Sequence, residues 1–215
     1  MNQSIRVGLI DWDVHVRSGR KLLIESTPGL DLVYESSGME SDVDGVLGSL
    51  IDVLVIEQRL GGWSGIDFIQ QLRLRVESAY ELPRIVITSP FETEQLLLQA
   101  FEAGVNSVVS LERGLSELTQ AINQSGQPGI EILDLYRLLS SLPTQRISDL
   151  ALRARIDALP EEFKDAVRGL AAALHSGSEV SWEELKLVDL AKELEIRELP
   201  EIFIKLWRGG LLDGE

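Results

Sequence analysis

The chain has 215 residues, 26% of them charged, and a formal net charge of −15, which is typical of a globular protein with an acidic surface. It has no cysteine, so disulfides and thiolate metal sites are excluded, and neither His15 nor His175 has neighbours at metal-ligand spacing. The acidic balance argues against non-specific nucleic-acid binding through a broad basic surface, and no apolar run is long enough for a membrane span.

Short apolar runs alternate with amphipathic segments through the first 122 residues. The runs suit buried strands because they are rich in β-branched residues and are bounded by Gly, Pro or polar positions. Strands are predicted at residues 5–10, 30–34, 53–56, 83–88 and 107–111, and helices at residues 16–25, 36–50, 64–76, 93–103 and 115–122. This alternation predicts an α/β fold with a five-stranded, doubly wound parallel sheet.

The pattern changes after residue 123. Residues 124–129 form a polar linker with Gly and Pro, which separates an N-terminal domain of residues 1–123 from a helical domain of residues 130–215. Helices are predicted in the second domain at residues 130–142, 145–159, 160–175, 181–194 and 200–207. Ser181 with Glu184 is a capping-box pattern that predicts the start of the fourth of these helices.

Two carboxylates follow predicted strands of the first domain. Asp11 comes directly after the first strand, and Glu57 ends the third, just before the Gly-rich loop Leu60-Gly-Gly-Trp-Ser-Gly65. In a parallel α/β sheet, the loops at the carboxyl ends of the strands form the binding crevice. We therefore expect Asp11 and Glu57 to lie at the crevice.

Residues 5–122 resemble the receiver domain of two-component response regulators, a flavodoxin-like fold. The resemblance is carried by the strand that ends at Asp11, the strand that ends at Glu57, the Gly-rich loop after it, the Ile85-Val-Ile-Thr88 strand, and the Ala103-Gly-Val-Asn-Ser107 turn. It implies a phosphoacceptor that binds Mg²⁺ together with an acidic pair. It also implies a lysine and a Ser or Thr that contact the phosphoryl group.

The match to the family's site is incomplete. Asp11 takes the place of the first acid and Thr88 that of the Ser or Thr. Trp12 stands at the second acid, for which Asp13 is a substitute only if it swings in, and Glu57 replaces the phosphoacceptor Asp. The Glu carboxylate lies one methylene further from the backbone, which changes the reach of the nucleophile.

Two further departures concern strand five, where Leu111 stands at the lysine position and Val108 at the aromatic switch position. These changes should abolish ordinary phosphorylation, leaving at most weak Mg²⁺ binding by Asp11 and Glu57 and no other cofactor. With Leu111 in place of lysine, no cation is expected beside the two acids, and one carboxyl pKa should be raised. Glu57 then either mimics the phosphorylated state or belongs to a degenerate site.

Two surfaces are candidates for partner binding. The helix at residues 93–103 carries more apolar side chains than one buried stripe needs, namely Leu96, Leu97, Leu98 and Phe101. They predict a homodimer or partner contact unless they pack under the sheet. Residues 181–214 resemble part of a winged helix that ends in a short strand, with Arg197, Lys205 and Arg208 as possible nucleic-acid contacts against Glu198 and Glu201.

The sequence favours an atypical response regulator that signals independently of phosphorylation, through protein–protein interaction. The alternative is a DNA-binding transcriptional regulator that uses the C-terminal helical domain. We expect binding rather than catalysis, because the crevice offers no activated nucleophile, catalytic histidine or phosphate cradle. We expect no membrane association, and a cytoplasmic location because the first residues lack the apolar core of a signal peptide.

Overall fold

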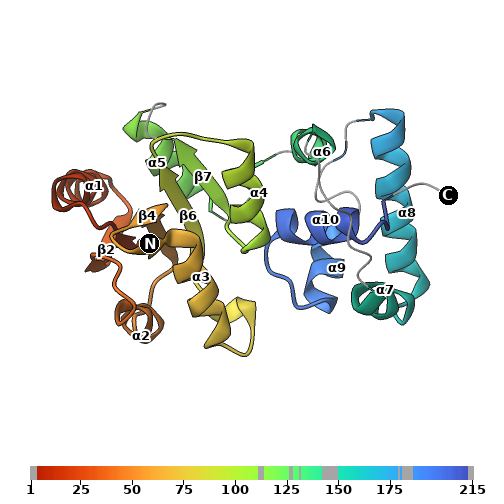
Figure 1. Ribbon diagram of the computed structural model, residues 1–215, viewed down its shortest axis with the longest axis horizontal. Helices are drawn as coiled ribbons and strands as arrows, with labels where there is room; N and C mark the ends of the chain where they lie inside the picture. The colour runs from red at the N-terminus through yellow and green to blue at the C-terminus, as the bar shows by residue number, and fades with distance from the viewer. Residues whose placement is uncertain are drawn as a thin grey trace. The chain divides into compact units, whose positions relative to one another are not determined.

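The computed structural model describes residues 4–110, 114–125, 128–130, 132–141, 150–178, 180 and 186–212. The chain divides into two compact units, Met1–Gly129 and Ile130–Glu215 (Figure 1). Leu111, at the predicted lysine position, and Ser181, at the predicted capping box, lie outside the described residues.

The first unit is built on a five-stranded parallel sheet. The strands are β1 (Ile5–Ile10), β2 (Leu30–Ser36), β3 (Val53–Glu57), β6 (Arg84–Ser89) and β7 (Ser107–Ser110). Their order is β2-β1-β3-β6-β7, and every neighbouring pair is parallel. The predicted doubly wound α/β sheet is therefore confirmed. The strand order reverses between β1 and β3, which is where such sheets place their binding crevice.

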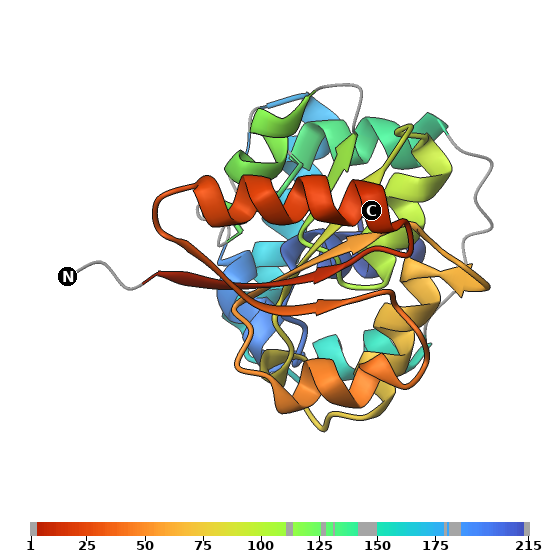
Figure 2. The same cartoon turned by 90° about the vertical axis from the view of Figure 1, so that its left-hand side faces the viewer.

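Helices cover both faces of this sheet. They are α1 (Val14–Ser26), α2 (Asp42–Gly48), α3 (Gly65–Leu74), α4 (Glu94–Glu102) and α5 (Leu115–Asn123), with a 3₁₀ turn at Ala79–Glu81. Buried side chains of α1 and α5 pack with one face of the sheet, and those of α2, α3 and α4 with the other. Figure 2 shows α1 and α2 on opposite sides of the strands. The central strand β3 is buried along its whole length because both faces of the sheet are covered.

The Gly-rich loop after β3 is a small hairpin that the sequence did not reveal. β4 (Arg59–Leu60) and β5 (Trp63–Ser64) pair antiparallel. The Trp63 indole Nε1 donates a hydrogen bond to the Gly38 carbonyl at 2.7 Å, and its ring lies 5.3 Å from that of Phe68. Trp63 thus packs the hairpin against the loop after β2.

The helix predicted at residues 36–50 is shorter than expected. β2 continues to Ser36, and α2 begins only at Asp42. Gly38 between them has φ +81°, in the left-handed region that favours glycine, and an added Cβ there would lie 2.8 Å from Ile10 Cγ2. The chain turns at Gly38, so the helix cannot start before this turn.

The described residues of the second unit form helices joined by turns and loops, and none of them forms a strand. Its helices are α6 (Ile132–Ser141), α7 (Leu150–Asp157), α8 (Glu161–Ser176), α9 (Leu187–Glu193) and α10 (Leu199–Arg208). Buried residues recur at helical spacing along α8, from Phe163 to Leu174. Pro160 is the N-cap of α8 rather than its first residue, and Gly177, with φ +69°, ends it.

The prediction of a short strand after the last helix is wrong for the described residues. The Gly210 N–H bonds to the Trp207 carbonyl at 3.1 Å, and the Leu211 N–H to the Leu206 carbonyl at 3.0 Å. Gly210 has φ +68°. These bonds satisfy the last carbonyls of α10, so residues 209–212 form a helix-ending turn and not a strand.

Candidate functional site: a buried arginine between two carboxylates

Three predicted residues meet at the carboxyl edge of the sheet. Asp11 follows β1, Glu57 ends β3, and Thr88 lies directly opposite Glu57 in the β3–β6 ladder. All three are buried. The Thr88 hydroxyl donates to Glu57 Oε2 at 3.1 Å. The central strands thus bring together the acids and the hydroxyl that the sequence placed at the crevice.

The side chain of Arg20 lies between the two carboxylates. Its Nη1 donates to Asp11 Oδ2 and its Nη2 donates to Glu57 Oε2 at 2.7 Å. Arg20 is only 2% exposed. A guanidinium remains protonated in proteins, so this is a buried cation bridging two buried anions. The expectation that no cation lies beside the acids was wrong.

The role of Arg20 was not predicted because a charged residue on a helix is usually expected to face solvent. The signal was nevertheless present, since Arg20 stands four residues before Ile24, and these are the two buried residues of α1. Residues four apart share one face of a helix. An arginine on the buried stripe of a helix needs an internal anion, and the acids at positions 11 and 57 supply two.

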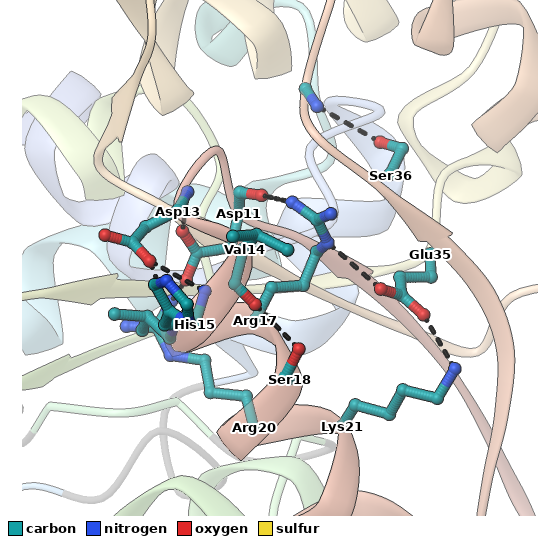
Figure 3. Close-up of polar contacts among 12 residues, drawn as sticks. Asp11, Asp13, Val14, His15, Arg17, Ser18, Arg20, Lys21, Glu35 and Ser36 are labelled. Carbon is teal, nitrogen blue, oxygen red and sulfur yellow. Dashed lines mark hydrogen bonds and ion pairs between the residues drawn. The ribbon is translucent and has the colours of Figure 1, made fainter.

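Asp13 does not join the cluster as a substitute acid. Its carboxylate caps α1 by accepting the N–H groups of His15 at 2.8 Å and Val16 at 3.1 Å (Figure 3). These bonds, led by that from Val16, lower the pKa of Asp13. The Asp13 N–H in turn donates to Asp11 Oδ1 at 2.9 Å. The backbone of Asp13 therefore orients the Asp11 carboxylate, and the Asp13 side chain caps the N-terminus of α1.

The remaining crevice residues lie outside this network. The Trp12 side chain is 54% exposed. Val108, on β7 at the expected aromatic position, is partly buried against the core beneath α3 and α4. Arg17 binds Glu35 at 3.0 Å and the Asp11 carbonyl at 2.6 Å, at the more exposed end of the site (Figure 3). Among the described residues, no group of three or more His, Asp or Glu side chains is placed to hold a metal ion.

Burial sets the protonation of Asp11. Removal from water raises the pKa of Asp11, which the Arg20 guanidinium and the Asp13 N–H partly offset, while the Glu57 charge raises it slightly further. The raised carboxyl pKa expected from the sequence is confirmed for Asp11. Its main cause is loss of water rather than the neighbouring acid.

No family model matches the chain. It is 26% identical over 140 residues to the transcriptional regulatory protein LiaR of Bacillus subtilis, and 28% identical over 130 residues to the DNA-binding transcriptional activator DevR/DosR of Mycobacterium tuberculosis. The matched segments cover 64% and 60% of this chain and 64% and 58% of the relatives, so the chain spans less than two thirds of either.

A solved structure, a LuxR-family two-component response regulator from Aurantimonas sp. SI85-9A1, is 27% identical to the chain, with a TM-score of 0.54. The match covers 64% of this chain and 96% of that one. The N-terminal unit has the fold of a response-regulator receiver domain. The helical unit follows it in the chain. In the described residues, no helix is both long and apolar enough to cross a membrane.

The predicted partner face of the receiver domain is mostly covered in this structure. Leu96, Leu98 and Phe101 on α4 are buried, and Leu97 is partly buried. A dimer or partner contact through these four residues stays a prediction. It requires α4 to present side chains that are buried in this structure.

Two of the three predicted nucleic-acid contacts of the helical unit, Arg197 and Lys205, lie beside acids. Lys205 Nζ lies 2.9 Å from Glu201 Oε1 on α10, and Arg197 Nε lies 3.6 Å from Glu198 Oε1. Both glutamates are buried, whereas Lys205 is exposed and Arg208 is partly exposed. Phosphate binding by Arg197 and Lys205 would compete with their carboxylate partners.

The raised pKa of Asp11 predicts a pH dependence of receiver stability. The folded state holds the Asp11 proton to higher pH than the unfolded chain, whose Asp pKa is about 3.9. The Asp11 contribution is therefore fully present below that pKa and is lost as pH rises through the folded pKa. Urea unfolding across this range should show wild type losing stability relative to Asp11→Asn. Parallel curves for the two proteins would contradict the prediction.

Proposed function

We propose that this protein is a transcriptional regulator of the response-regulator type, which contacts DNA through residues 130–215 and whose receiver domain works without phosphorylation. The observation that carries the DNA role is the similarity of the chain to relatives named as transcriptional regulators, one of them as DNA-binding. A helical unit follows the receiver domain in this chain. Lys205 and Arg208 on α10 are its candidate phosphate contacts.

Independence from phosphorylation is supported by the state of Glu57. Its Oε2 accepts hydrogen bonds from both Arg20 and Thr88, at 2.7 and 3.1 Å. A carboxylate held by two donors in a buried site is a poor nucleophile, and phosphoryl transfer depends on exact placement of nucleophile, metal and donor. The buried charge network supports a receiver domain that is held in one state.

A DNA-retention experiment tests the proposal. The full-length protein is passed over random-sequence duplex DNA at increasing salt, with and without a small-molecule phosphodonor and Mg²⁺. We expect retention that falls with salt, enrichment of a common sequence, and no effect of the phosphodonor. Lys205→Ala with Arg208→Ala should lower the slope of log affinity against log salt by about 2.

Lys21→Ala is the matched control, because Lys21 is a partly exposed lysine on α1 of the receiver domain. It should leave the salt slope unchanged. Absence of retention even at low salt would overturn the DNA role. A phosphodonor that changes the affinity, or adds a phosphoryl group to Glu57 or Asp11, would overturn phosphorylation independence.

Binding to a partner protein is the second candidate, and the charge of the molecule favours it. The net charge is −15, and Lys205 is already paired with a buried glutamate. An acidic surface repels the DNA backbone. The retention experiment separates the two functions, because a protein-binding role alone leaves no salt-dependent retention on DNA.

A further inference from the structure

The Mg²⁺ ion that the receiver family implies does not fit this site. One carboxylate oxygen of each acid that would hold it, Asp11 Oδ2 and Glu57 Oε2, is bound to the guanidinium of Arg20. Mg²⁺ demands near-octahedral oxygen coordination at about 2.0–2.1 Å. An ion in contact with these oxygens would occupy the space of the guanidinium, so the ion and Arg20 compete for one place.

Arg20 has no alternative position within the fold that preserves its bonds. Its side chain is 2% exposed and lies with Ile24 on the buried face of α1. Moving a guanidinium away from two carboxylates, without exposing it to water, would leave three charges unpaired in the interior. Such a separation is strongly unfavourable. The guanidinium is thus a fixed part of the site.

The charges of the cluster also indicate the role of Arg20, which is to balance part of the negative charge of the two acids. Asp11 and Glu57 contribute two negative charges within one buried cluster, and Arg20 contributes one positive charge. A divalent cation would balance two acids, but it must be taken up from solution. Arg20 is present whenever the domain is folded and requires no ion.

We propose that Arg20 is a resident cation that replaces the divalent metal of the receiver site, excludes Mg²⁺ from it, and ties β1, α1 and β3 into one arrangement. Thr88 extends the same network to β6. This inference deepens the phosphorylation-independent part of the proposed function. It does not depend on DNA binding, so its test fails or succeeds separately from the retention experiment.

Metal binding to the full-length protein tests the inference, with Mn²⁺ as a paramagnetic probe in place of Mg²⁺. Free Mn²⁺ is followed by electron paramagnetic resonance at low millimolar concentrations. Wild type should show no saturable site that depends on Asp11 and Glu57. Arg20→Ala removes the competing cation, and it should bind Mn²⁺ about 100-fold or more tightly than wild type.

Two further variants locate the effect. Arg20→Lys keeps a positive charge and should exclude Mn²⁺ as wild type does. Arg20→Ala combined with Glu57→Gln should lose the gained affinity, because one ligand is removed. Mn²⁺ should also raise the thermal midpoint of Arg20→Ala and not that of wild type, since an ion that binds only the folded state stabilises it.

The wild-type measurement can overturn the inference even if Arg20→Ala fails to fold. Saturable Mn²⁺ binding by wild type that disappears in Asp11→Asn would show that the metal and Arg20 share the site, and it would overturn the proposal. A folded Arg20→Ala that binds Mn²⁺ no more tightly than wild type would do the same. No such wild-type site, together with a gained site in Arg20→Ala, supports the resident cation.

Discussion

Replacing Arg20 by methionine is expected to remove about 3–5 kcal/mol from the free energy of unfolding at neutral pH, because it leaves two buried carboxylates without a cation. Arg20, Asp11 and Glu57 are all buried. Domains are typically stable by about 5–15 kcal/mol, so much of the receiver domain's stability would be lost. Urea unfolding of the full-length protein, followed by circular dichroism, measures the difference.

Lys21→Met is the control for this change. Lys21 is the next residue of α1 and pairs with Glu35 at 2.9 Å, with side chains 42% and 31% exposed. An ion pair in contact with solvent contributes about 0–1 kcal/mol, so the control should lose little stability. If Arg20→Met costs no more than Lys21→Met, the buried charge network is not what stabilises the site.

A rescue experiment distinguishes lost charge balance from lost packing. Asp11→Asn and Glu57→Gln, added to Arg20→Met, remove the charges that the first change leaves unpaired. Replacing every member of a buried ionic cluster by neutral groups is often close to neutral in stability. The triple variant should therefore be more stable than Arg20→Met alone. A triple variant that is less stable would indicate that the shape of the arginine matters more than its charge.

The fold of the receiver domain was largely predictable, and the reason lies in its strands. Apolar runs such as Val53 to Ile56 are long enough and rich enough in β-branched residues to mark buried parallel strands. The two-residue strands β4 and β5 carry no such pattern, so the hairpin was not predicted. Its position depends on a hydrogen bond from Trp63 to Gly38, a contact between segments far apart in sequence.

The site was predictable in its acids and not in its cation. Asp11, Glu57 and Thr88 stand at strand ends, and a parallel sheet necessarily gathers strand ends at one edge. Arg20 reaches the cluster from a helix, and its direction depends on how α1 packs on the sheet. The residues of the crevice loops alone therefore indicate two acids without a cation, whereas Arg20 of α1 lies between them.

In the C-terminal unit, too, contacts set by helical spacing were predictable and the backbone conformation of a turn was not. Glu201 and Lys205 are four residues apart, so their ion pair follows from helical spacing. The turn after α10 depends on Gly210 adopting a positive φ, whereas the sequence was interpreted as a short strand at this place. Glycine serves both turns and strand ends, and sequence alone did not separate the two.

Gly65→Ala should destabilise the receiver domain by about 1–3 kcal/mol through steric conflict at the end of β3. A Cβ on Gly65 would lie 2.5 Å from the carbonyl oxygen of Glu57, which is backbone and cannot rotate away. The Gly65 N–H also bonds to the Gln58 carbonyl at 2.7 Å. Alanine favours a helix over glycine, so any loss measured at this first residue of α3 occurs despite that gain.

Gly62→Ala is the matched control within the same loop, because a Cβ there meets nothing within 4 Å. It should change the free energy of unfolding by no more than about 0.5 kcal/mol. The loss in Gly65→Ala should also couple to Arg20, since a displaced Glu57 backbone carries its carboxylate away from the guanidinium. A double-mutant cycle of Gly65→Ala with Arg20→Met should therefore be non-additive. Additive losses would mean that the strand end can move without disturbing the ion pair, and that Gly65 shapes the loop alone.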